Sequence, residues 1–162
     1  MEGVTTCTDA VETFLEAVAE READLRAFVQ IDSTRLRSEA AMHDAIPQDA
    51  RGPLHGRLVA VKEVFDVAGY TCAWGTPIHR DRVPKTDAAA VRLLRDAGAM
   101  IAGVTVSTEY AMSRVGPTVN PWDPARTPGA SSQGSAVAVG AGLVPLALGS
   151  QTIGSVIRPA AY

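Results

Sequence analysis

Two clusters of serine and glycine lie close together near the end of the chain and contain residue types that nucleophilic chemistry needs. Residues 126–135 read RTPGASSQGS and residues 149–159 read GSQTIGSVIRP, with an apolar segment between them. A serine hydroxyl attacks a carbonyl carbon once a nearby base accepts its proton. If the fold brings Ser131 and Ser155 together, the two clusters predict an active site.

Lys62 is the candidate base because it ends the apolar run LVAVK, which is typical of a buried strand. Burial favours the neutral form of a lysine, and only that form accepts a proton. The structural alternative is a strand-end lysine whose ammonium reaches water. Histidine is a more common base, but neither His55 nor His79 lies in a pattern typical of classical hydrolases, and Ser155 is not in a Gly-x-Ser-x-Gly elbow. A phosphate loop is excluded because the first cluster lacks a Gly-Lys-Ser/Thr ending.

The order of these blocks resembles the amidase signature family. Residues 52–69, GPLHGRLVAVKEVFDVAG, precede the two serine clusters in family order, and residues 120–123, NPWD, stand where the family usually has an Asn-Pro-aromatic turn. The resemblance covers roughly residues 28–162. It implies an α/β fold with a mixed central sheet flanked by helices, and a chain that corresponds to the N-terminal part of a longer amidase domain.

The resemblance also implies a role for each candidate residue. Lys62, Ser131 and Ser155 take the positions of the catalytic lysine, the bridging serine and the nucleophile, and a cis peptide bond is implied between Ala130 and Ser131. The oxyanion hole is expected from the backbone N–H groups of Thr152, Ile153, Gly154 and Ser155.

Four residues depart from the family pattern or vary it, and one of them is Gln133, which replaces a usual glycine or serine. Ala130 and Ile153 replace glycines, and a β-branched residue at 153 is unfavourable if the turn needs a positive φ. Arg158 follows Ser155 by three positions, as in the malonamidase-type branch. Its guanidinium predicts a small substrate with a carboxylate, while the alternative is a structural hydrogen bond to loop carbonyls.

The resemblance leaves three functions open. The first is a serine amidohydrolase that converts an amide to acid and ammonia through an acyl-enzyme, with a small-molecule amide as substrate and no metal or cofactor. The second is the amidase subunit of a tRNA-dependent amidotransferase. The third is a truncated, non-catalytic fragment that acts by association. Whichever function holds, the expected protein partner is a second copy of the chain or a missing C-terminal segment.

Composition limits the broad class of protein. The 162 residues are 46% hydrophobic and 20% charged with a net charge of −3, which predicts one globular core without a basic face for nucleic acid. Cys7 and Cys72 are too few for a disulfide framework or a zinc site. The N-terminus has no secretory pattern, and the most apolar window, residues 136–148, is too short to span a membrane. A cytoplasmic location is therefore expected.

The hydrophobic spacing predicts a helical N-terminal layer over residues 1–46 and an α/β region over residues 53–162. The spacing in the first part favours two helices, and His43 lies at a helix end in a structural role. The expected helices cover residues 9–29, 33–44, 86–97 and 132–142, and the expected strands cover residues 58–62, 100–106 and 143–148.

Overall fold

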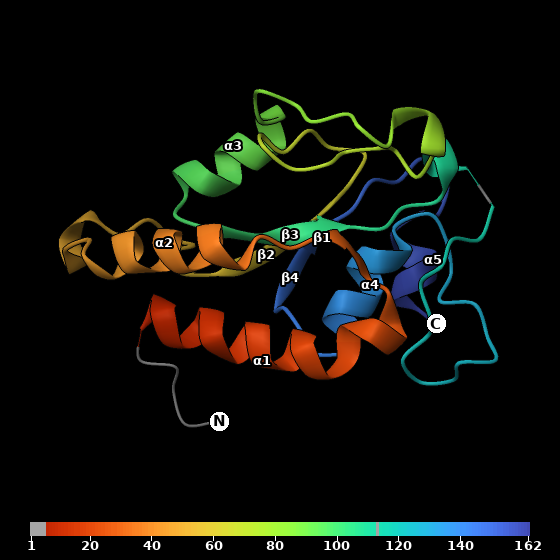
Figure 1. The fold of residues 1–162 in the computed structure, drawn as a ribbon, viewed down its shortest axis with the longest axis horizontal. Helices are drawn as coiled ribbons and strands as arrows, with labels where there is room; N and C mark the ends of the chain where they lie inside the picture. The colour runs from red at the N-terminus through yellow and green to blue at the C-terminus, as the bar shows by residue number, and fades with distance from the viewer. Residues whose placement is uncertain (1–5, 113) are drawn as a thin grey trace.

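The computed structural model describes residues 6–112 and 114–162, which fold around a four-stranded sheet (Figure 1). The helices are α1 (Cys7–Leu25), α2 (Ser33–Asp44), α3 (Ala89–Asp96), α4 (Gln133–Gly140) and α5 (Ile157–Ala160). The strands are β1 (Phe28–Gln30), β2 (Leu58–Lys62), β3 (Met100–Thr105) and β4 (Leu146–Leu148). In Figure 1, α3 lies on one side of the sheet and α1 and α4 lie on the other.

β2 lies in the interior of the sheet, whose strand order is β1-β3-β2-β4. It pairs in parallel with β3 on one side and with β4 on the other, whereas β1 pairs antiparallel with β3. Lys62 is level with Thr105, and Val61 is level with Leu148. The carboxyl ends of the three parallel strands therefore meet at one edge, and the loops that follow them gather there. The predicted mixed central sheet is confirmed.

β2 and β3 are buried along their whole length because helices or loops cover both faces. Toward α1, α2 and α4, their side chains form one cluster with Phe14, Leu36 and Val137. Toward α3, Val61 and Val91 belong to a second cluster. This double burial explains why the parallel strands are continuous apolar runs. Within the described residues, no helix is both long enough and apolar enough to cross a membrane.

The bounds predicted for α2 and β2 are confirmed, but the first helix ends earlier than its spacing indicates. α1 stops at Leu25, Arg26 adopts a left-handed φ of 51°, and Phe28 pairs with Thr105 of β3. Phe28 continues the helical spacing of apolar residues, yet it faces the core from a strand. Pairing with a distant strand overrides the local pattern here, which the sequence does not reveal.

Other elements are also shorter than predicted. α3 begins at Ala89 rather than at residue 86, because the Asp87 carboxylate instead accepts a hydrogen bond from Ala68 N and pairs with Arg95. β4 covers only the end of the predicted strand 143–148. The helix predicted over residues 132–142 runs from Gln133 to Gly140, and the strand predicted over residues 100–106 ends one residue early.

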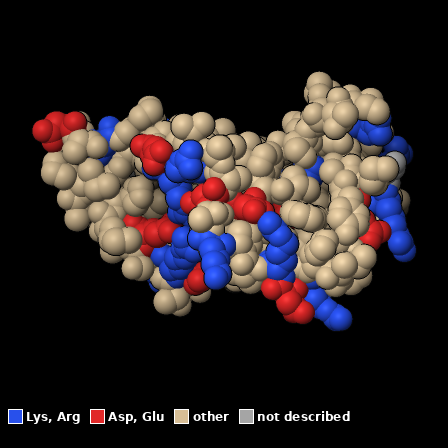
Figure 2. All heavy atoms as spheres, turned by 90° about the horizontal axis from the view of Figure 1, so that it is seen from above, with Lys and Arg blue, Asp and Glu red and all other residues tan. Residues whose placement is uncertain are grey.

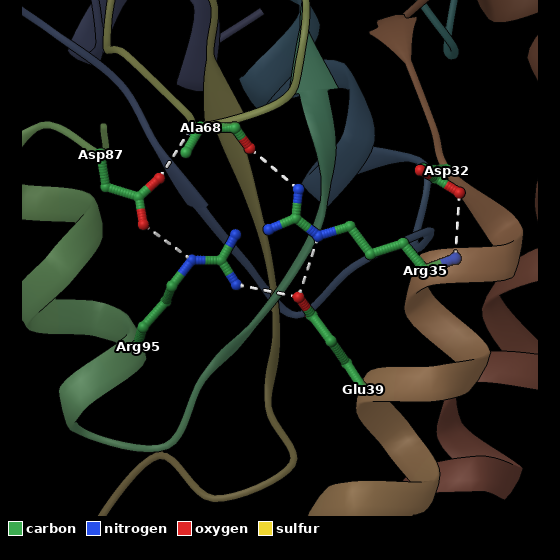
Figure 3. Close-up of polar contacts among 6 residues, drawn as sticks. All are labelled: Asp32, Arg35, Glu39, Ala68, Asp87 and Arg95. Carbon is green, nitrogen blue, oxygen red and sulfur yellow. Dashed lines mark hydrogen bonds and ion pairs between the residues drawn. The ribbon is translucent and has the colours of Figure 1, made fainter. Parts of the chain in front are cut away.

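A network of charged side chains joins α2 to α3 (Figure 3). Glu39 Oε1 accepts hydrogen bonds from Arg35 Nε at 3.1 Å and from Arg95 Nη1 at 3.2 Å. Arg35 Nη1 also donates to Ala68 O at 2.8 Å, and Arg95 Nε donates to Asp87 Oδ2 at 3.0 Å. The Glu39 side chain is only 15% exposed, so one carboxylate holds two guanidinium groups in a partly desolvated position.

We expect Glu39→Gln to lower the free energy of unfolding by about 1–3 kcal/mol, because both arginines lose their shared anion while remaining partly buried. Urea unfolding measures this loss. Glu12→Gln is the matched control, since Glu12 pairs with Arg37 in a much more exposed position. The Glu12 variant is expected to lose far less. Equal losses in the two variants would show that the Glu39 network contributes no more than a surface ion pair.

The surface of the α3 side carries charges of both signs. Figure 2 shows acidic and basic side chains side by side on this face of the described residues. A mixed pattern of this kind differs from the continuous basic surface that nucleic acid requires. The exclusion of nucleic acid as a partner remains a prediction.

Candidate active site

Lys62 ends β2 with its side chain fully buried, at the edge where the parallel strands meet. Its Nζ atom donates hydrogen bonds to Ser131 Oγ at 2.7 Å and to Ser150 Oγ at 2.9 Å. Burial lowers the pKa of Lys62 to about 8, while the neighbouring charge of Glu63 acts in the opposite direction. The amine is therefore neutral in an appreciable fraction of molecules near neutral pH, and the alternative of a solvated strand-end lysine is wrong.

Ser131 is buried beside Lys62 and is positioned by the turn before α4. The peptide bond between Ala130 and Ser131 is cis, as the family resemblance implies. Ser131 O accepts a hydrogen bond from Thr108 N at 3.2 Å. Gly129 has a φ of 83°, and a Cβ at this position would lie 2.6 Å from Pro159 Cα. The first cluster thus packs directly against the end of the second cluster.

Ser132 holds the two serine clusters together through its backbone and its hydroxyl. Its N–H donates to Ser155 O at 3.0 Å. Its hydroxyl donates to Ser150 O at 3.2 Å and accepts from Ser150 N at 3.3 Å. A Cβ on Gly149 would lie only 2.9 Å from this hydroxyl, so glycine permits the close approach of the two segments.

Ser155 lies in the turn before α5 and is partly buried. The turn is held by Gln151, whose Oε1 accepts hydrogen bonds from Val156 N at 3.0 Å and Ile157 N at 2.9 Å. The hydroxyl of Ser155 makes no hydrogen bond to Ser131 within the part of the chain that the structure describes. The fold therefore joins Lys62 to Ser131 directly, and it brings Ser155 alongside them through its backbone.

The predicted oxyanion hole lies in the same turn. Within the described ranges, the backbone N–H groups of Thr152, Ile153, Gly154 and Ser155 donate no hydrogen bond to the protein. Ile153 is 89% exposed and does not have a positive φ. A β-branched residue is therefore compatible with the backbone of this turn. The use of these N–H groups as an oxyanion hole stays a prediction.

Arg158 lies directly beyond the nucleophile candidate. Its backbone N–H donates to Gly154 O at 2.9 Å, and its Nη2 atom lies 3.6 Å from the place that a Cβ on Gly154 would occupy. The side chain is exposed and makes no ion pair or loop hydrogen bond with the residues that the structure describes. The structural alternative of a side-chain hydrogen bond to loop carbonyls is therefore not observed among the described residues, and the substrate-binding role stays a prediction.

The two candidate histidines bond to groups other than the serines. His55 precedes β2, so it is at the opposite end of that strand from Lys62. His79 Nε2 lies 3.1 Å from Tyr110 Oη, and its ring is 5.0 Å from the Trp74 ring. Neither histidine bonds to a serine hydroxyl among the described residues, so the geometry agrees with lysine as the base.

Three residues of this site are absent from the sequence-based prediction: Ser132, Ser150 and Gln151. Ser150 is the second hydroxyl partner of Lys62, and Gln151 positions the nucleophile turn. One signal for Ser150 is present in the sequence, since it follows β4 by two residues. A residue after a parallel strand lies near the end of the adjacent strand, where Lys62 is.

Comparison with known proteins gives a consistent result. Residues 9–162 match the model of the family described as Amidase. A glutamyl-tRNA(Gln) amidotransferase subunit of Azoarcus sp. (strain BH72) is 44% identical over 156 residues, which cover 92% of this chain and 32% of that protein. The corresponding subunit of Salinibacter ruber is 40% identical and is covered to 32% of its length.

Solved structures show the same relationship. The native peptide amidase of Stenotrophomonas maltophilia has a TM-score of 0.86 at 34% identity, with 96% of this chain and 35% of that chain covered. The corresponding glutamyl-tRNA(Gln) amidotransferase subunit of Thermotoga maritima has a TM-score of 0.80 at 31% identity, with 95% and 33% covered. The chain thus spans about a third of the length of the proteins that it matches.

Proposed function

This chain belongs to the amidase family, and on that basis we propose that the whole protein is a serine amidohydrolase that converts a carboxylic amide to an acid and ammonia. The observation that carries the proposal is the buried hydrogen bond between Lys62 and Ser131. An amine whose pKa is lowered to about 8 is suited to accept a proton near neutral pH. Substrate, partners and cytoplasmic location remain proposals.

Acylation begins with transfer of the Ser155 hydroxyl proton to Ser131 Oγ, while the Ser131 proton passes to neutral Lys62. Ser155 Oγ attacks the amide carbonyl, and the free N–H groups of residues 152–155 stabilise the oxyanion. The amide C–N bond then breaks as Lys62 returns the proton through Ser131 to the leaving nitrogen. Water attacks the acyl-enzyme by the same route, which releases the acid and restores Ser155.

The direct test is release of ammonia from a series of small amides by the whole protein. We expect turnover with an acyl-enzyme intermediate that mass spectrometry detects as an adduct on Ser155. The absence of both ammonia and adduct across neutral and acidic amides would contradict the proposed function.

Arg158 sets the expected substrate preference. A substrate carboxylate would form a planar, bidentate pair with its guanidinium, which lysine cannot reproduce. We expect Arg158→Lys to reduce kcat/KM for a small acidic amide by about ten- to a hundredfold, which corresponds to roughly 1.5–3 kcal/mol. A neutral amide of similar size should be nearly unaffected. Equal losses for the two substrates would show that Arg158 supports the turn and does not bind the substrate.

A second candidate function is the amidase subunit of a tRNA-dependent amidotransferase. The supporting observation is that the relatives from Azoarcus and Salinibacter described above are subunits of that kind. Such a subunit would release ammonia from glutamine only in the presence of partner subunits. Glutaminase activity that requires added partners would select this function, whereas hydrolysis of simple amides by the protein alone would select the first.

A further inference from the structure

Three residues with metal-binding side chains meet at the amino end of β2, remote from the serine clusters. They are Cys7, His43 and His55, and their ligand atoms all lie within 4.8 Å of one another. Cys7 Sγ is 3.6 Å from His55 Nε2, and the two imidazole rings are 5.3 Å apart. Cys7 begins α1, His43 lies in the last turn of α2, and His55 is in the turn before β2.

The backbone around this cluster is fixed by contacts between the three segments. Cys7 N donates to Asp44 Oδ1 at 2.6 Å, which joins the start of α1 to the end of α2. His55 N donates to Gly52 O at 3.0 Å. Gly56 has a φ of 70°, and a Cβ there would lie 2.7 Å from Cys7 Sγ. Glycine at 56 therefore makes room for the thiol beside His55.

The imidazole groups have unused hydrogen-bonding capacity. The Nδ1 atoms of His43 and His55 are both buried, and neither has a hydrogen-bond partner among the described residues. Buried polar atoms in folded proteins nearly always have a partner. A cation binds only one nitrogen of each ring, so these atoms show that neither Nδ1 is committed to a protein partner. The case for a shared ligand is that one sulfur and one nitrogen from each ring lie within 4.8 Å of one another.

We propose that Cys7, His43 and His55 bind a divalent cation of the zinc class. Thiolate and imidazole are the preferred ligands of Zn²⁺, with bond lengths of about 2.3 Å to sulfur and about 2.0–2.1 Å to nitrogen. In a tetrahedral site these lengths place sulfur and nitrogen about 3.6 Å apart, which is the distance between Cys7 Sγ and His55 Nε2. Binding replaces the thiol proton, which passes to solvent, and a water molecule completes the four ligands.

The sequence predicts no metal site, because it has only two cysteines, and it predicts a structural role for His43. The fold changes this expectation by placing two histidines beside Cys7. Cys7 is 7% exposed, so a cation bound to its sulfur would be largely enclosed by protein. The carboxylate of Asp44 adds negative charge beside the cation, and its oxygens are already engaged by Cys7 N, Thr8 N and Thr8 Oγ1. Asp44 is therefore a neighbour that orients a ligand and not a ligand itself.

The experiment is a titration of the chelator-treated whole protein with Co²⁺, which substitutes for Zn²⁺ and reports its ligands by absorption. We expect saturation at one equivalent, with visible bands of tetrahedral cobalt and a near-ultraviolet thiolate-to-cobalt band. Cys7→Ser should remove the near-ultraviolet band, and His43→Ala should weaken binding by at least about tenfold. Zn²⁺ should displace Co²⁺ and raise the Tm of the unsubstituted protein.

The remaining cysteine and histidine provide matched controls. Cys72 and His79 lie outside the cluster. The variants Cys72→Ser and His79→Ala should therefore still bind one equivalent of Co²⁺ with the same absorption bands. Because Cys72→Ser leaves Cys7 as the only thiol in the sequence, a thiolate band in that variant assigns the ligand even if Cys7→Ser fails to fold. Absence of saturable binding, or a thiolate band that disappears in Cys72→Ser, would overturn the proposal.

Discussion

Ser155→Ala is expected to abolish formation of the acyl-enzyme and to reduce amide hydrolysis by about 10⁴-fold or more, because no other group supplies the attacking oxygen. A fluorophosphonate probe should label the unsubstituted protein at Ser155 and leave the variant unlabelled. Mass spectrometry of the labelled protein identifies the modified residue.

Ser38→Ala is the control for this labelling, since Ser38 is an exposed serine on α2, far along the chain from the site. Its labelling should equal that of the unsubstituted protein. Stoichiometric labelling of Ser155→Ala at a different serine would show that the nucleophile has been assigned to the wrong residue.

Lys62→Ala is expected to lower kcat/KM by about 10³-fold or more, because the serine pair then has no base. In the unsubstituted protein, raising the pH through about 8 converts Lys62 to the neutral form, so kcat/KM should rise over that range. The rise should disappear in Lys62→Arg, whose guanidinium stays protonated. The measurement is kcat/KM for one amide at a series of pH values.

His79→Ala is the control for the base, because the His79 ring packs against Trp74 and bonds to Tyr110, and among the described residues it makes no hydrogen bond to Lys62 or to a serine. Its pH dependence should match that of the unsubstituted protein. If His79→Ala loses as much activity as Lys62→Ala, His79 and not Lys62 is the base.

Motif order and strand pattern were sufficient to predict much of the arrangement. The apolar run ending in Lys62 specifies a strand that is covered on both faces, and its burial is what makes a lysine amine suitable as a base. Gly129 packs against Pro159, and these two residues belong to the two serine–glycine clusters that the sequence shows as separate turns. The order of the motifs carries the resemblance to the family, and that resemblance implies the mixed sheet and the placing of Lys62 with Ser131.

Other features depend on contacts between distant segments and were not predicted. Phe28 continues a helical pattern, yet its backbone pairs with β3. Ser150 gains its contact with Lys62 only because β4 lies beside β2. Cys7 and His55 are far apart in sequence, so their approach appears only after α1 and the turn before β2 are packed. In each case the partner is specified by topology.

Ile153 replaces a glycine of the family pattern, but it strains the backbone of the turn less than a β-branched residue at this position predicts. A β-branched residue in place of glycine is one of the sequence features that favour a non-catalytic fragment. The turn does not use a positive φ at this residue, and the side chain extends into solvent. Backbone strain at Ile153 therefore gives no support to the non-catalytic alternative.

The interior position of β2 gives the two halves of the proposed site different local stabilities. β2 is hydrogen-bonded to a parallel strand on each side, so exposing the backbone around Lys62 requires disruption of the central sheet. The Ser155 turn is mostly solvent-exposed and is held by few contacts, such as those of Gln151 and Ser132. Subglobal opening of this turn can therefore detach the nucleophile while the base stays in the most slowly exchanging part of the fold.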